Sequence, residues 1–126
     1  MSLVLKRVYE PPDAGDGTRV LVDRLWPRGI AKDKARIELW LKDIAPSDAL
    51  RKRFHRYPDE WDVFLAAYFV ELDNAAARAA AGAMFERLRD GPVSLLYAAR
   101  DEQRNNAVAL RMWLDRQRSD ESFAKQ

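Results

Sequence analysis

The chain has 126 residues, contains no cysteine and has a single histidine, His55. Without cysteine it forms no disulfide, no thiolate nucleophile and no cysteine-ligated zinc or iron–sulfur site. One histidine also excludes a metal site built from several histidines of one chain. Apolar runs are short: Phe64–Val70 is far from the roughly 20 residues that cross a bilayer. Arginine, carboxylate, tryptophan and His55 are therefore the main groups left for chemistry.

The chain also lacks a large excess of charge of either sign, because it has 22 Lys and Arg and 20 Asp and Glu, which gives a net charge of +2. This near balance provides no broad basic field of the kind that favours nucleic acid. Met1–Tyr9 has no long apolar segment and no small-residue cleavage site, so no signal peptide is expected. These features predict a soluble cytoplasmic protein that does not bind membranes.

Strand-forming segments alternate with segments of helical periodicity. Leu3–Tyr9, Thr18–Asp23 and Val93–Ala98 are rich in strand formers, and the middle one contains three consecutive apolar residues, as in a sheet covered on both faces. Trp61–Leu72 has apolar residues at helical spacing. The pattern predicts an α/β fold of three layers, with a mostly parallel sheet of about three or four strands flanked by five or six helices.

Length and composition predict one α/β domain over residues 1–118, followed by a frayed polar tail over residues 119–126. Within the domain, four apolar residues spaced i, i+3, i+4 and i+7 predict a further helix that ends at Pro46: Ile37, Trp40, Leu41 and Ile44. Pro58 suits the first turn of the Trp61 helix. N-caps are expected at Ser47, at Asn74, and at Asn105 or Asn106.

In open α/β sheets, ligands bind beyond the carboxyl ends of the strands. Arg24 and Arg28 follow the second predicted strand, and Arg100 follows the third. If these strands are neighbours, the three guanidinium groups converge and bind a small carboxylate or phosphate ligand. A helix N-terminus at Asn105 would add backbone N–H donors. In the alternative interpretation, Asp23 pairs with one of these arginines and the pair is purely structural.

Trp26 and Trp40 are expected to shape the pocket, although Trp26 would equally serve as a plug of the sheet edge. Three residues are the candidate catalytic groups: Asp23, Asp43 and His55. The imidazole of His55 titrates near neutral pH, which suits proton transfer, but a cation near a helix C-terminus is also favourable without catalysis. Asp43 either serves a site or forms an ion pair with Lys42 or Arg36. These residues suit an enzyme or a binding protein, and they indicate no metal and no particular cofactor.

The basic segment Arg51–Tyr57 supports an alternative function. Four basic residues stand beside Phe54 and Tyr57, a combination that contacts phosphates and bases in nucleic-acid-binding proteins. The acidic residues elsewhere argue against a broad basic face, so nucleic acid is the less favoured partner. A nucleic-acid or protein-interaction module nevertheless stands as the alternative to the anion site.

Several stretches of the chain form a characteristic pattern that spans about residues 4 to 114: Arg7–Pro12, Arg19–Gly29, Trp40–Ser47, Leu50–His55, Leu95–Glu102 and Asn105–Val108. This pattern resembles the YeaO-like group of the bacterial family called domain of unknown function 488. The resemblance implies a compact α/β protein whose signature residues fall on the strand-end loops and near His55. Family members often carry histidine at the positions of Arg104 or Asn106, and longer relatives carry cysteine near Tyr97. The resemblance therefore transfers neither a cysteine mechanism nor a histidine mechanism at those positions.

Overall fold

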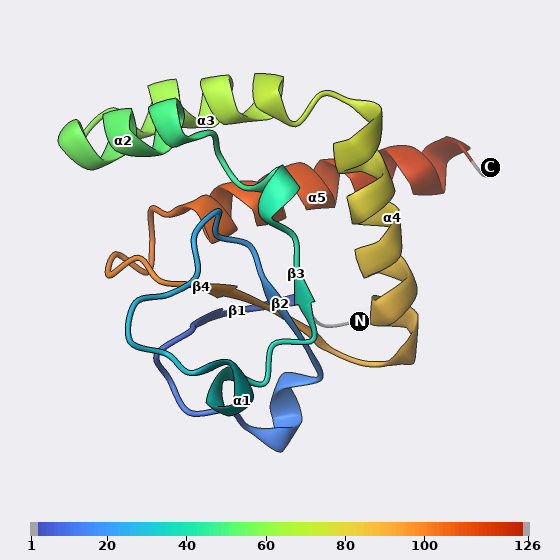
Figure 1. Cartoon of the computed structure of the whole chain (residues 1–126). Helices are drawn as coiled ribbons and strands as arrows, with labels where there is room; N and C mark the ends of the chain where they lie inside the picture. The colour runs from blue at the N-terminus through green and yellow to red at the C-terminus, as the bar shows by residue number, and fades with distance from the viewer. Residues whose placement is uncertain (1–2, 125–126) are drawn as a thin grey trace.

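The computed structural model describes the backbone of residues 3–124 as an α/β fold built on a four-stranded sheet (Figure 1). The strand order is β1-β4-β2-β3, and every pair is parallel. The strands are β1 (Leu3–Arg7), β2 (Thr18–Leu21), β3 (Leu39–Trp40) and β4 (Val93–Tyr97). This confirms the predicted α/β class and the strand number, and the sheet is parallel throughout rather than mostly parallel.

Five α-helices and two short 3₁₀ helices complete the described part of the chain: η1 (Ala14–Asp16), α1 (Lys32–Ala35), η2 (Lys42–Ile44), α2 (Asp48–Arg56), α3 (Trp61–Glu71), α4 (Ala75–Asp90) and α5 (Asn106–Ala124). Ser47 and Asn74 cap α2 and α4 as expected, since their side chains accept hydrogen bonds from Leu50 N and Ala77 N. Helix α5 continues past the predicted domain boundary at residue 118, and the boundary itself stays a prediction.

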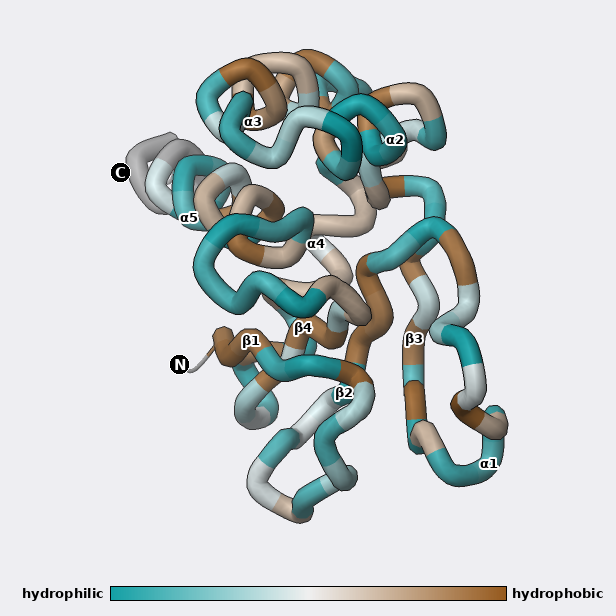
Figure 2. The backbone as a smooth tube through the Cα atoms, turned by 90° about the vertical axis from the view of Figure 1, so that its left-hand side faces the viewer, coloured by the Kyte–Doolittle hydropathy of each residue, from teal (hydrophilic) through white to brown (hydrophobic). Residues whose placement is uncertain are grey.

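The two faces of the sheet are covered differently. Val20, Val22 and Leu95 face the larger core, which they share with buried side chains of α3, α4 and α5: Phe64, Tyr68, Met84 and Leu110. Leu21 and Leu96 face a smaller core that is closed by the long connection between β2 and β3. Hydrophobic residues follow the strands in Figure 2, whereas α2 is mostly hydrophilic. No helix in the described range is long and apolar enough to span a bilayer.

The predicted helix over Ile37–Ile44 is wrong. Leu39 and Trp40 form β3 and pair with Val20 and Leu21 of β2. Their side chains lie on opposite faces of the sheet, as the strand period requires, with Leu39 against the larger core and Trp40 against the smaller one. Four apolar residues of this segment have helical spacing. The segment is nevertheless extended at Leu39 and Trp40, because its backbone hydrogen bonds to the edge of β2.

The predicted start of the next helix is also wrong. Helix α3 begins at Trp61 with Glu60 as N-cap, so Pro58 lies in the turn between α2 and α3. Tyr57 N and Glu60 N donate to Arg53 O and Tyr57 O, which closes that turn. Pro58 therefore limits the end of α2 rather than opening α3.

Candidate functional site

Asp23 links the ends of the two central strands. It lies just after β2, and its Oδ2 accepts a 2.9 Å hydrogen bond from Ala98 N, just after β4. Its Oδ1 accepts a 2.8 Å hydrogen bond from Asn106 Nδ2 in the first turn of α5. Burial raises the pKa of Asp23, and the hydrogen bonds from Asn106 and Ala98 offset this effect only in part. The Asp23 carboxylate thus joins the ends of β2 and β4 to the first turn of α5.

Side chains of the chain itself accept from several backbone N–H groups at and before the start of α5. Asn105 is 2% exposed, and its Oδ1 accepts from Val108 N. Asp101 Oδ1 accepts from Gln103 N and Arg104 N, and these hydrogen bonds hold the pKa of Asp101 below its ordinary value. The predicted role of Asn105 as N-cap is confirmed. Its predicted contact with a ligand stays a prediction, and Gln103 N, Arg104 N and Val108 N already have acceptors.

Replacing Asp23 with alanine is expected to lower the free energy of unfolding by about 1–3 kcal/mol, because Ala98 N–H and the Asn106 amide both lose a buried acceptor. Urea denaturation followed by circular dichroism measures the loss. Asp43→Ala is the control, since Asp43 is exposed and should change stability by less than about 0.5 kcal/mol. Equal stability of the two variants would show that Asp23 does not hold these strand ends together.

Trp26 and Trp40 pack against each other on the smaller core, with ring centroids 5.5 Å apart in an edge-on arrangement. Both indole N–H groups have backbone acceptors: Trp26 Nε1 donates to Ile30 O and Trp40 Nε1 donates to Asp23 O, each at 2.7 Å. The structure therefore places the two tryptophans in the closure of the smaller core. This arrangement matches the plug interpretation of Trp26.

The three arginines of the predicted anion site have different surroundings. Arg24 is half-buried, and its Nε and Nη2 donate to Pro46 O and Ala45 O at 3.0 and 3.2 Å. Arg28 and Arg100 are exposed. The cavity beside Arg24 is lined by neither of them. Among the three, only Arg24 is therefore held in a fixed position beside a cavity.

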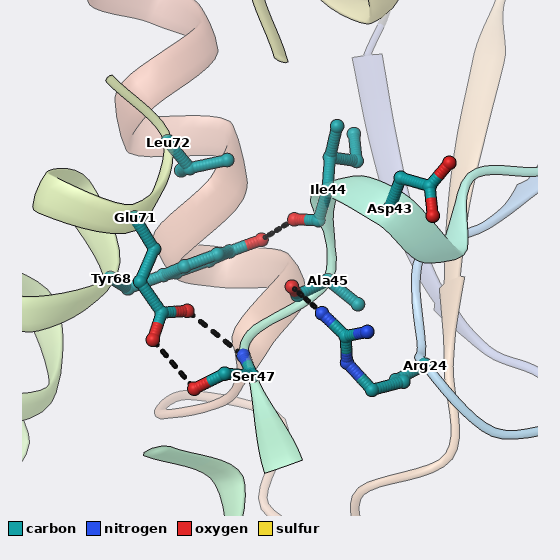
Figure 3. Close-up of a pocket in the computed structure, with 8 residues that line it drawn as sticks. All are labelled: Arg24, Asp43, Ile44, Ala45, Ser47, Tyr68, Glu71 and Leu72. Atoms are coloured by element: carbon teal, nitrogen blue, oxygen red, sulfur yellow. Dashed lines mark hydrogen bonds between the residues drawn. The ribbon is translucent and has the colours of Figure 1, made fainter. Parts of the chain in front are cut away.

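That cavity, of about 320 Å³, lies where the β2 end meets η2, α2 and α3, and is shown in Figure 3. Its lining combines predicted and unpredicted residues: Arg24, Asp43, Ile44, Ala45, Ser47, Tyr68, Glu71 and Leu72. Figure 3 shows the linker from Ile44 to Ser47 between Arg24 and the side chains of α3. Arg24 and Asp43 thus meet at one cavity, although the sequence analysis assigned them to different segments.

The linker from Ile44 to Ser47 is held by side chains of α3. Tyr68 is fully buried, and its hydroxyl donates to Ile44 O. Burial raises the pKa of Tyr68, which keeps this donor protonated. Glu71 accepts from Ser47 N at 2.8 Å and from Ser47 Oγ at 2.6 Å. Together with the two bonds from Arg24, these contacts fix the backbone that forms the wall of the cavity.

Sequence reasoning missed Tyr68, Glu71 and Leu72 as cavity residues. Tyr68 falls within the apolar pattern of Trp61–Leu72, and its hydroxyl is the available signal, because a buried hydroxyl needs a hydrogen-bond partner. Glu71 follows the apolar run of α3, and no sequence pattern connects it with Ser47, 24 residues earlier. The contact depends on how α3 packs against the linker.

His55 and the rest of the basic segment lie elsewhere, on and just after α2. His55 is exposed in the last turn of that helix and does not line the cavity. Arg51 pairs with Asp48 at 3.4 Å, and Arg53 pairs with Glu60 at 3.0 Å. Acidic neighbours thus offset two of the basic side chains of this segment, which weakens the nucleic-acid alternative.

Comparison with known proteins places the chain in a family. The family model described as "Inactive DUF488-N3 subclade" matches residues 2–126. Uncharacterized protein YeaO of Escherichia coli (strain K12) is 40% identical over 114 residues, which is 90% of this chain and 97% of that protein. Uncharacterized protein Rv3073c of Mycobacterium tuberculosis (strain H37Rv) and Uncharacterized protein Mb3100c of Mycobacterium bovis are each 43% identical over 109 residues, covering 86% of this chain and 90% of theirs.

No solved structure matches the chain significantly. The family match extends over both central strand ends, the cavity and all of α5, so it covers every part of the candidate site. The resemblance inferred from the signature segments is confirmed by the family model and by the similarity to YeaO. The chain belongs to the inactive DUF488-N3 subclade.

Proposed function

We propose that this chain is a binding protein for a small molecule with an anionic group, and that Arg24 in the cavity at the strand ends is the anchor for that group. The observation that carries the proposal is the state of the Arg24 guanidinium. Two of its nitrogens are held by backbone carbonyls, and among the described residues no carboxylate forms an ion pair with it. A fixed guanidinium that keeps its full charge and has Nη1 to spare suits a carboxylate or phosphate.

Three further observations support binding rather than catalysis. The family to which the chain belongs is described as inactive. His55, the candidate for proton transfer, does not line the cavity. Asp23 has both carboxylate oxygens engaged by Ala98 and Asn106, so that it serves the strand ends. Arg24 and Asp43 are the predicted site residues that the cavity retains.

Isothermal titration calorimetry with phosphate, sulfate, acetate and succinate tests the proposal. We expect at least one of these anions to bind the wild-type chain and Arg24→Gln to weaken that binding at least tenfold, because glutamine lacks the charge. Arg28→Gln is the matched control, since Arg28 is exposed and outside the cavity, and it should bind as the wild type does. Circular dichroism checks that each variant is folded.

Two results would contradict the proposal. One is the absence of binding by the wild-type chain for every anion at millimolar concentration. The other is equal binding by folded Arg24→Gln and by the wild-type chain, which would place the anion elsewhere. Arg24→Lys separates charge from shape, because lysine keeps the charge but not the planar two-point geometry. It should bind more weakly than the wild type and more tightly than Arg24→Gln.

A further inference from the structure

The cavity beside Arg24 contains more negative than positive charge. Arg24 is the one cationic side chain among its lining residues, whereas Asp43 and Glu71 are both carboxylates. A ligand with negative charge alone would gain from Arg24 and would be opposed by both carboxylates. The lining therefore favours a ligand that also carries a positive charge.

Asp43 and Glu71 differ in how they are held. The Glu71 carboxylate is bound by Ser47 through both N and Oγ, so its charge is spread over two hydrogen bonds that fix the linker. Asp43 lies in η2, is exposed, and among the described residues takes part in no ion pair. Asp43 is thus the carboxylate that remains available to a cationic group.

Arg24 and Asp43 line one cavity and do not neutralise each other. Figure 3 shows both on the same side of the linker, with the side chains of α3 on the other side. Opposite charges that share a cavity without pairing leave a place for a molecule that partners each of them. A volume of about 320 Å³ is at the small end of ligand sites, which are roughly 300–1,000 Å³, and suits a compact molecule.

From this arrangement we infer that the ligand is a small zwitterion, with its carboxylate on Arg24 and its ammonium group on Asp43. The inference rests on the proposed function and adds the second recognition element. It assigns Asp43 the role of a specificity residue, which selects amino acids over simple carboxylates. Arg24 and Asp43 do not pair with each other, so each would form an ion pair with the ligand group of opposite charge.

Calorimetric titrations with matched probes test this inference. Each simple carboxylate is paired with the amino acid of the same chain length: acetate with glycine, propionate with β-alanine, and butyrate with 4-aminobutyrate. We expect the wild-type chain to bind at least one amino acid five times more tightly than its matched carboxylate. The three lengths cover different separations between the two charges.

Asp43→Asn should bring the affinity for that amino acid down to the level of the carboxylate. Its affinity for the carboxylate should be unchanged or higher, because a repulsive charge has been removed. Arg24→Gln should lose both ligands. Asp59→Asn is the matched control, since Asp59 is an exposed carboxylate outside the cavity, and it should keep the wild-type preference.

The outcomes separate the inference from the proposed function. Equal binding of carboxylates and amino acids to the wild-type chain, with both lost in Arg24→Gln, overturns the zwitterion and leaves the anion site intact. A preference for amino acids that survives in Asp43→Asn also overturns the assignment of Asp43. Absence of binding for every probe and every anion overturns both.

Discussion

Replacing Asp16 with alanine is expected to lower the free energy of unfolding by about 3–5 kcal/mol. Asp16 pairs with Arg19, which is 4% exposed, and with Lys6 Nζ at 3.0 Å. The remaining guanidinium nitrogens of Arg19 donate to Ala35 O. Removing Asp16 would leave the buried charge of Arg19 with a carbonyl as its remaining partner, and an uncompensated buried charge is costly.

Urea denaturation at neutral pH measures this loss, with Asp59→Ala as the control at an exposed carboxylate that forms none of the described ion pairs. The control should change stability by no more than about 0.5 kcal/mol. A loss below about 1 kcal/mol in Asp16→Ala would contradict the prediction. It would show that water replaces Asp16 as the partner of Arg19 and Lys6.

The same carboxylate makes stability depend on pH. Burial alone would raise the pKa of Asp16, but the hydrogen bonds from Lys6, Asp13 N and Arg19 outweigh it and hold the pKa below its ordinary value. The folded protein therefore binds this proton less readily than the unfolded chain. The stabilisation by Asp16 is complete above its ordinary pKa near 4 and is lost as the pH falls through the lower, folded-state value. Thermal unfolding of the wild type and Asp16→Asn should differ most at neutral pH and converge in acid.

The pKa of Asp23 is shifted in the opposite direction, so its effect on the pH dependence of stability is also opposite. Its pKa is raised by burial, so the folded chain holds this proton more tightly than the unfolded chain, and acid relieves the cost of its buried charge. Protonation of Asp23 thus favours the folded state as the pH falls toward the ordinary pKa near 4, whereas protonation of Asp16 destabilises it at more acidic pH. In Asp16→Asn, the acid loss due to Asp16 is absent and the contribution of Asp23 is retained.

The sheet could be predicted from sequence where a strand is long and buried on both faces. A run of three buried apolar residues lies in or at the end of each of the two central strands, Val20–Val22 and Leu95–Tyr97, as two covered faces require, and both strands lie close to their predicted positions. Two residues, Leu39 and Trp40, are too few to show a strand period. Their conformation is decided by Glu38 N and Leu41 N, which donate to backbone carbonyls of β2, and this pairing is invisible in the local sequence.

The position of the candidate site at the strand ends could be predicted from the sequence, but the arrangement of its side chains could not. Since β2 and β4 are neighbours, Asp23 and Asn105 do lie at the same edge of the sheet, as expected. The direction of each side chain depended on tertiary partners. Arg24 is turned by Ala45 O and Pro46 O toward the larger core, whereas Trp26 packs on the smaller one. Spacing along the chain does not carry that information, because adjacent residues of a loop have no fixed period.

Gly17 is the position where a single methyl group should do the most damage to the central pair of strands. Its φ is +65°, and a Cβ at this position would lie 2.0 Å from Pro92 O. That carbonyl accepts the hydrogen bond from Thr18 N that begins the pairing of β2 with β4. The clash is with backbone and not with a flexible side chain. We expect Gly17→Ala to lower the free energy of unfolding by about 3 kcal/mol or more, from overpacking together with the cost of a positive φ.

Gly82→Ala is the matched control for this substitution. Gly82 lies inside α4, and a Cβ there would meet no heavy atom within 4 Å. Alanine should raise stability by up to about 1 kcal/mol at this position, because it gains helix propensity without a clash. The same glycine-to-alanine substitution is therefore expected to change the free energy of unfolding in opposite directions at the two positions. Urea denaturation of both variants measures these changes. Equal stability of Gly17→Ala and the wild type would contradict this prediction. It would show that the close approach of Gly17 to Pro92 is not needed to bring β2 and β4 together. The position of Asp23 beside Ala98 would then depend on other contacts.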